Sequence, residues 1–200
     1  GTDWAEALPE ALAYQLRRGR AALVLAPGGG LGVQTALANG AGQVTVVEPN
    51  PLLVHVVRDD YTQFHGGLYT DPRVTVRTEG VRTWQTGERY AVIQLPLTDG
   101  YRPVRSGAYS LSENYLYTVE ALAGYLDRLE DDGLLVLTRW LQSPPNETVR
   151  LLASALEALE AIGVPDPASH VVAYRSFQIG TLLVSRSPWT VAELETIRAF

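Results

Sequence analysis

The sequence predicts a single α/β domain built on a mostly parallel, doubly wound β-sheet that ends in an antiparallel hairpin. Three observations lead to this fold class. Short apolar runs rich in Val and Leu alternate with helical patterns along the chain. A run of glycines follows the first apolar segment, where a strand would pass into a helix. Near the C-terminus only a few residues separate two strand-like segments, so these must pair antiparallel.

The composition fits one domain with a full core over 1–200. The chain has 200 residues, 46% of them hydrophobic, which leaves little room for a second domain of similar size. The net charge of -6 argues against nucleic-acid binding, because phosphate grooves need basic side chains. The chain has no cysteine, and its three histidines lie far apart in sequence, so we expect no metal site and favour small molecules as partners.

The first half of the chain is predicted to form one helix and then two strand–helix units. Asp3 and Glu6 have capping-box spacing at the start of the first helix. Pro51 suits the first position of a later helix, and Gly40 suits the end of the one before it. The expected elements are a helix over 3–18, a strand over 21–26, a helix over 33–39, a strand over 44–47 and a helix over 51–64.

The second half continues the alternation and closes with the hairpin. Ser110 with Glu113, and Thr190 with Glu193, again have the spacing of helix-starting capping boxes. The expected elements are a strand over 74–77, a helical turn over 81–84, a strand over 90–95, a helix over 110–129, a strand over 134–138, a helix that follows Pro144-Pro145 and ends at 162, strands over 170–174 and 179–185, and a last helix from 190.

Four glycines between the first strand and its helix point to a bound nucleotide-type cofactor. Gly28, Gly29, Gly30 and Gly32 let the backbone turn sharply and let a ligand approach closely. Glu48 stands 20 positions after Gly28, just past the second strand, where a carboxylate would accept hydrogen bonds from ribose hydroxyls. The alternative is a tight turn beside a solvated charge.

A nicotinamide dinucleotide fits this loop less well. In the register G-x-G-x-x-G the last position is Val33 when counted from Gly28, and Thr35 when counted from Gly30. A pyrophosphate would therefore lack its close contact with the helix. S-adenosylmethionine carries no phosphate and does not need the third glycine.

Further segments resemble the spermidine/spermine synthase family, which has the class I S-adenosylmethionine-dependent methyltransferase fold. The glycine loop is followed in that family's order by Val47-Glu48, 71–74, Glu79-Gly80 and Asp132-Gly133. The segments 110–120 and 138–140 look like a bacterial branch in which such a domain is fused to membrane-spanning segments. The resemblance implies a seven-stranded sheet and a cofactor that is S-adenosylmethionine or decarboxylated S-adenosylmethionine.

The resemblance implies that this chain has all the residues that bind the adenosyl part of the cofactor. The four glycines would line the methionine and ribose, Glu48 would bind the ribose, and Glu79 with Gly80 would meet the adenine. For Glu79 and Gly80 a plain turn at a strand end is the alternative. The catalytic half departs from the family, because Pro96 stands where aminopropyltransferases carry their general base, and Leu31 replaces an acid in the glycine loop. We therefore do not expect authentic spermidine synthesis.

The sequence assigns no catalytic residue. The candidates near the fourth strand are Asp99, Glu113 and Tyr115, although Glu113 is equally explained as a helix cap. Arg139 with its neighbour Trp140 could face the site or stack an Arg on an aromatic ring.

Two functions remain open. The first is an S-adenosylmethionine-type binding domain that transfers a methyl or aminopropyl group to an unidentified small acceptor. The second is a non-catalytic sensing or scaffolding domain that reports to attached transmembrane helices. Under either hypothesis we expect a piece of a larger integral membrane protein, on its cytoplasmic face, with a homo-oligomer as one possible assembly.

Overall fold

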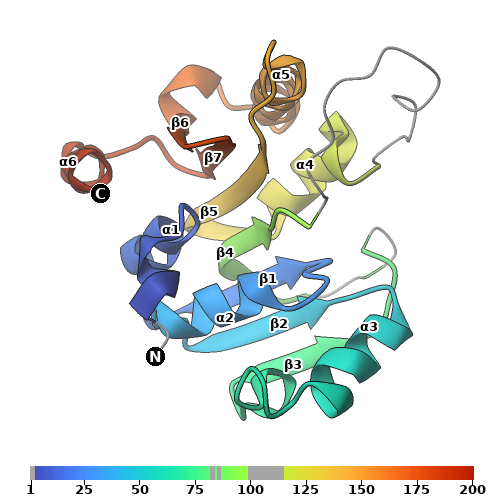
Figure 1. Ribbon diagram of the computed structural model, residues 1–200. Coiled ribbons are helices and arrows are strands. Elements are labelled where there is room, and N and C mark those ends of the chain that lie inside the picture. Colours follow the sequence, from blue (N-terminus) through green and yellow to red (C-terminus); the bar gives the residue numbers. More distant parts are fainter. Residues whose placement is uncertain (1–2, 82–83, 85–86, 99–114) are drawn as a thin grey trace.

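The computed structural model describes residues 3–81, 84, 87–98 and 115–200. It contains one seven-stranded sheet, whose arrangement Figure 1 shows. The strand order is β3-β2-β1-β4-β5-β7-β6. β1 to β5 pair in parallel, whereas β7 runs antiparallel to both β5 and β6. This arrangement confirms the predicted fold and its C-terminal hairpin. The strands are β1 Ala21–Leu25, β2 Gln43–Val47, β3 Val74–Arg77, β4 Tyr90–Leu95, β5 Leu129–Trp140, β6 Val171–Ser176 and β7 Ile179–Ser185.

Helices cover both faces of the sheet (Figure 1). The α-helices are α1 Ala11–Leu16, α2 Leu31–Ala38, α3 Pro51–His55, α4 Val119–Asp127, α5 Asn146–Ala161 and α6 Val191–Ala199. Short 3-10 segments are Asp3–Ala7, Leu68–Thr70, Tyr115–Tyr117 and Pro167–His170, and α3 continues as a π-helical turn over Val56–Asp60. No helix among the described residues is long and apolar enough to cross a bilayer.

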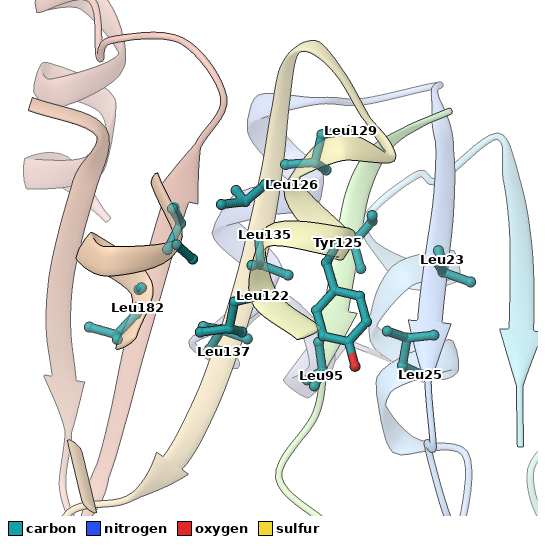
Figure 2. Packing of buried hydrophobic residues seen from close by; sticks show 14 of the residues in the cluster. Leu23, Leu25, Leu95, Leu122, Tyr125, Leu126, Leu129, Leu135, Leu137 and Leu182 are labelled. Atoms are coloured by element: carbon teal, nitrogen blue, oxygen red, sulfur yellow. The ribbon is translucent and has the colours of Figure 1, made fainter. Parts of the chain in front are cut away.

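Alternate residues of the central strands build two separate cores. On one face Leu23 and Leu25 of β1 and Leu135 of β5 pack against Leu122 and Tyr125 of α4 (Figure 2). On the other face the intervening residues of the same strands pack against α1, α2 and α3. A strand buried on both faces needs apolar residues at successive positions, which explains the continuous apolar runs in the sequence.

The N-terminal helix differs from the prediction. In place of one helix over 3–18, the chain forms a 3-10 segment, Asp3–Ala7, and the separate helix α1. Pro9 lies between them, and proline both lacks an N–H and disfavours helical backbone at the residue before it. The helical spacing of apolar residues over 3–18 therefore continues across the interruption at Pro9, although the helix itself does not.

The helix expected over 51–64 is shorter than predicted. It ends with the π-helical turn at Asp60, and Phe64, at the end of the expected range, is 89% exposed. Gly66 and Gly67, both with positive φ, complete the turn that follows.

The region before α4 also differs. Thr118 caps α4 and its side chain accepts a hydrogen bond from the N–H of Ala121, whereas the predicted cap at Ser110 and Glu113 lies outside the described residues. β5 begins at Leu129 and thus includes residues 130–133, which were expected to lie between a helix and a strand. A register shift in its pairing with β4 accommodates these extra residues, as a β-bulge does.

A group of ion pairs holds the amino ends of the parallel strands. Arg17, whose side chain is buried, donates to the carbonyl oxygen of Asp132 and to the carboxylate of Glu193, each at 2.7 Å. It thereby joins α1 to β5 and α6. Arg20 donates hydrogen bonds to both carboxylate oxygens of Asp132, and these bonds hold the pKa of Asp132 below its ordinary value.

We expect Arg17→Met to lower the free energy of unfolding by about 2 kcal/mol. This is less than the roughly 3–5 kcal/mol lost when a fully buried ion pair is broken, because the acidic partners of Arg17 reach solvent. Urea denaturation would measure the change. Arg18→Met, the same substitution at an exposed neighbour, should change stability by under about 0.5 kcal/mol. Equal losses in both variants would show that the Arg17 ion pairs contribute nothing.

Candidate functional site

The glycine loop joins β1 to α2 at the carboxyl edge of the sheet. α2 begins at Leu31, two residues before the predicted start. Gly28 and Gly30 have φ of 56° and 86°, and Ala26 has φ of 48°, which is uncommon for a residue with a side chain. Such backbone persists only where the surroundings fix it, and it clusters at functional sites.

The glycines of the loop differ in what surrounds them. A Cβ on Gly30 would stand 2.6 Å from the Leu68 side chain, and one on Gly32 would stand 3.1 Å from Pro96. Internal packing therefore explains these two glycines without a ligand. A Cβ on Gly29 would meet no atom within 4 Å, so Gly29 faces open space. Of the predicted cofactor glycines, Gly29 is the one free to approach a ligand.

Glu48 is buried directly after β2 and is bonded to the glycine loop. Its side chain accepts a hydrogen bond from the N–H of Gly28 at 3.0 Å and another from the N–H of Asn50 at 2.9 Å. The residue is 3% exposed. The structure thus brings the predicted acid and loop together. A carboxylate has about four acceptor positions, so two remain for hydroxyl donors.

Tyr69 lies beside this pair and was not predicted from the sequence. Its ring approaches the place of a Cβ on Gly30 at 3.8 Å. Burial raises the pKa of Tyr69, and the negative charge of Glu48 raises it further. Its hydroxyl is buried and makes no hydrogen bond to the described part of the chain. Tyr69 sits in a 3-10 segment between a turn and β3, where no sequence motif marks it.

Glu79 and Gly80 follow β3 at the same edge of the sheet. The N–H of Glu48 donates to the carbonyl oxygen of Arg77 at 3.0 Å, which fixes the end of β3 beside the end of β2. Both Glu79 and Gly80 are exposed, and the carbonyl of Gly80 accepts a hydrogen bond from the N–H of Trp84. Glu79 and Gly80, the residues predicted to meet the adenine, therefore lie near Glu48, the residue predicted to bind the ribose, and are exposed to solvent. Gly80 also forms part of a turn.

The structure says little about the catalytic candidates. Asp99 and Glu113 lie outside the described residues. Tyr115 is 53% exposed in the 3-10 segment before α4. Pro96 directly follows β4, where it packs near the start of α2, and Leu31 is exposed at the first position of that helix.

Arg139 has a packing partner near the end of β5. Its guanidinium lies 4.9 Å from the centre of the Tyr117 ring, and it pairs with the carboxylate of Glu147 at 3.2 Å. Of the two interpretations of Arg139, the structure shows the guanidinium stacked on an aromatic ring. The ring belongs to Tyr117 and not to the neighbouring Trp140.

One protein of known sequence is similar to part of this chain. No protein-family model matches the chain. A polyamine aminopropyltransferase of Corynebacterium efficiens is 33% identical over 123 residues, which cover 59% of this chain and 22% of the relative. The chain thus matches about a fifth of that relative's length.

Two solved structures show the same architecture over nearly the whole chain. A spermidine synthase in complex with the transition-state analogue AdoDATO superposes with a TM-score of 0.63 at 16% identity, covering 100% of this chain and 65% of that one. Human methyltransferase-like protein 13 in complex with SAH superposes with a TM-score of 0.62 at 18% identity, covering 98% and 89%. The chain therefore has the class I methyltransferase fold as spermidine synthases have it.

We expect Gly30→Ala to destabilise the domain and Gly29→Ala to leave its stability unchanged. Gly30 combines a positive φ with a 2.6 Å approach to Leu68, which together should cost about 1–3 kcal/mol. Gly29 has neither constraint. Thermal unfolding of the two variants would measure the difference. A stable Gly30→Ala variant would contradict the assigned packing role.

Proposed function

We propose that this chain is an S-adenosylmethionine-type binding domain of transferase ancestry. The observation that carries the proposal is the buried carboxylate of Glu48, held by the N–H of Gly28 next to the open approach at Gly29. A carboxylate with two acceptor positions left, facing a loop that a ligand can reach, suits the paired hydroxyls of a ribose.

The similar proteins support an adenosyl ligand. One structural neighbour was solved with SAH and another with AdoDATO, and the sequence relative is a polyamine aminopropyltransferase. A dinucleotide is disfavoured because Val33, in the place of the third glycine, is a buried residue of the α2 core. S-adenosylmethionine and its decarboxylated form are the two candidate cofactors.

Aminopropyl transfer to a polyamine is not the proposed reaction. A polyamine is a polycation, and one of its amines must lose a proton before it attacks. Pro96 follows β4 where the family carries its proton acceptor, and Leu31 presents an apolar, exposed side chain at the start of α2. Methyl transfer depends mainly on proximity and alignment and places fewer demands on such groups.

A second candidate function is sensing or scaffolding without catalysis. It is favoured by one observation, that packing alone accounts for Gly30 and Gly32 while both oxygens of Glu48 already accept backbone hydrogen bonds. A membrane-embedded parent protein, a cytoplasmic location, a homo-oligomer and the identity of the acceptor belong to the proposal under either function.

We expect Glu48→Gln to weaken binding of S-adenosylhomocysteine at least tenfold. Loss of a charge-assisted hydrogen bond costs about 1.5–3 kcal/mol, and about 1.4 kcal/mol is already tenfold. Titration calorimetry with S-adenosylhomocysteine, S-adenosylmethionine and decarboxylated S-adenosylmethionine would measure the affinities.

Asp71→Asn is the matched control, because it removes one carboxylate charge at the other end of β3. Since Glu48 also holds the glycine loop, thermal unfolding must show that the Glu48→Gln variant is folded. Unchanged affinity in a folded Glu48→Gln variant would remove the ribose assignment, and no binding by the wild type would favour the scaffold.

The domain should not make spermidine from putrescine and decarboxylated S-adenosylmethionine. General bases usually contribute about 10²–10⁴-fold of rate, so the loss slows the reaction without forbidding it, and the assay must be sensitive. Mass spectrometry of the product, compared with an authentic synthase, provides that sensitivity. Turnover within about tenfold of the synthase would show that another group in this domain supplies the base.

A further inference from the structure

The strand β6 forms one edge of the sheet and lacks the features that normally keep an edge strand from pairing with another chain. Those features are short length, proline, lysine and β-bulges. β6 has six residues, contains neither proline nor lysine, and pairs with β7 without a register shift. The opposite edge strand, β3, has only four residues and follows a turn that contains Pro72. The edge at β6 is therefore the one open to a further strand.

Two hydrogen bonds show how the neighbouring strand β7 divides its backbone groups. The N–H of Leu141 donates to the carbonyl oxygen of Gln178, and the N–H of Arg186 donates to that of Gly133. Both bonds continue the register of the β5–β7 pairing beyond its two ends. Since backbone groups alternate in direction along a strand, the even-numbered residues of β7 bond to β5 and the odd-numbered residues bond to β6.

Alternate residues of β6 consequently point their backbone groups away from the sheet. The odd-numbered residues of β7 pair with the even-numbered residues of β6. The backbone groups of Val171, Ala173 and Arg175 thus face outward, where no strand of the described chain lies. The N–H of Val171 already donates to the carbonyl oxygen of Ala168 in the preceding turn. Ala173 and Arg175 keep a donor and an acceptor each for a further strand, and Val171 keeps its acceptor.

The turn after β6 holds an aromatic side chain in solvent in an unfavourable backbone conformation. Phe177 and Gln178 form the two-residue turn between β6 and β7, and Phe177 is 96% exposed. Its φ is 51°, whereas glycine, asparagine or aspartate normally occupies such a turn position. Aromatic side chains are enriched in protein interfaces, and strained backbone clusters at functional positions. The ring therefore marks the end of β6 as a contact surface.

We propose that β6 is a dimer interface, at which two copies of this chain pair their β6 strands antiparallel and join their sheets. The twofold axis passes Ala173, which lies opposite Ala173 of the partner subunit. The N–H and carbonyl groups of these two alanines bond to each other across the axis. The N–H of Arg175 donates to the carbonyl oxygen of the partner's Val171, and the symmetry repeats this bond on the other side of the axis.

The residues of β6 favour a second copy of the chain in this register. Arg175 is the one charged residue of the strand. With the axis at Ala173 it lies opposite an apolar valine, whereas an axis at Arg175 would place two arginines directly opposite each other, which is unfavourable. The register also pairs all three outward-facing residues, and the small, exposed side chain of Ala173 allows close approach at the axis.

The same register gives the exposed aromatic ring a contact. Counting outward from the axis, Phe177 lies opposite residue 169 of the partner subunit, within the 3-10 segment that precedes β6. The ring would therefore be covered by the partner, and it would extend the contact beyond the paired strands. A symmetric interface of this kind repeats each contact once, so both rings are covered.

Sedimentation-velocity centrifugation over a range of protein concentrations tests the interface. We expect the wild type to form a dimer that dissociates on dilution, and Ala173→Pro to weaken this dimer by at least about tenfold. The proline removes an outward-facing N–H and no bond to β7, so the domain should still fold. A wild type that is monomeric at every concentration, or a dimer that Ala173→Pro does not weaken, would overturn the inference.

Charge variants at the axis test the register and remain informative if Ala173→Pro does not fold. Ala173→Glu places two carboxylates opposite each other in the dimer, and Ala173→Lys places two ammonium groups there, so each variant alone should be monomeric. An equal mixture of the two should dimerise, because opposite charges then meet. Ala173 is exposed, so neither substitution buries a charge in the monomer. A mixture that stays monomeric, or a Glu variant that dimerises like the wild type, would contradict the proposed axis.

Removing the exposed ring tests the contact at the turn. Phe177→Asn should weaken the dimer by at least about tenfold, yet unfold at the same or a higher temperature, because asparagine tolerates a positive φ. Phe64→Asn is the matched control, since it removes another exposed ring, after α3, and should leave the dimer unchanged. Equal dimerisation by the wild type and both variants would exclude the turn from the interface and overturn the arrangement.

This inference goes beyond the proposed function and does not rest on it. β6 lies at the opposite end of the strand order from β2, which Glu48 follows. S-adenosylhomocysteine should therefore bind equally to the wild type and to Ala173→Pro, as titration calorimetry would measure. Loss of the dimer with this binding intact supports a separate interface, whereas loss of both in a folded Ala173→Pro variant would contradict the separation.

Discussion

The hydrogen bonds from Gly28 and Asn50 to the carboxylate of Glu48 are the constraint on which this site depends. A carboxylate that is 3% exposed must be compensated, and here two backbone N–H groups do so. The same bonds bind the end of β1 to the end of β2, so the loop keeps its positive-φ backbone. These hydrogen bonds thereby fix the direction in which Gly29 faces and the position at which α2 begins.

The two edges of the sheet differ in how far their polar groups are satisfied by the protein itself. At the amino edge Arg17 and Arg20 satisfy nearby carboxylates, and the chain gains stability there. Toward the carboxyl edge the buried hydroxyls of Tyr69 and Thr181 have no hydrogen-bond partner in the described part of the chain. Natural domains accept such costs at functional sites, since groups left ready for a ligand cannot also be satisfied by the protein.

Sequence patterns predicted what local periodicity encodes. The succession of strands along the chain, the hairpin around Ser176 and the pairing of Glu48 with its loop all follow from apolar runs, glycines and spacing. The break at Pro9 was missed because the helical period continues across it. Tyr69 and the Tyr14–Gln94 bond, which joins residues 80 positions apart, exist only after the strands pair, so no window of sequence contains them.

Pro96 connects the departure from the aminopropyltransferases to the packing of this domain. Its ring lies 3.1 Å from the place of a Cβ on Gly32, so it occupies space between the end of β4 and the start of α2. An acidic side chain at position 96 would lie beside the apolar start of α2 and would lack the packing contact that the proline ring makes with Gly32. Any proton acceptor for a transfer reaction must therefore come from another element of the chain.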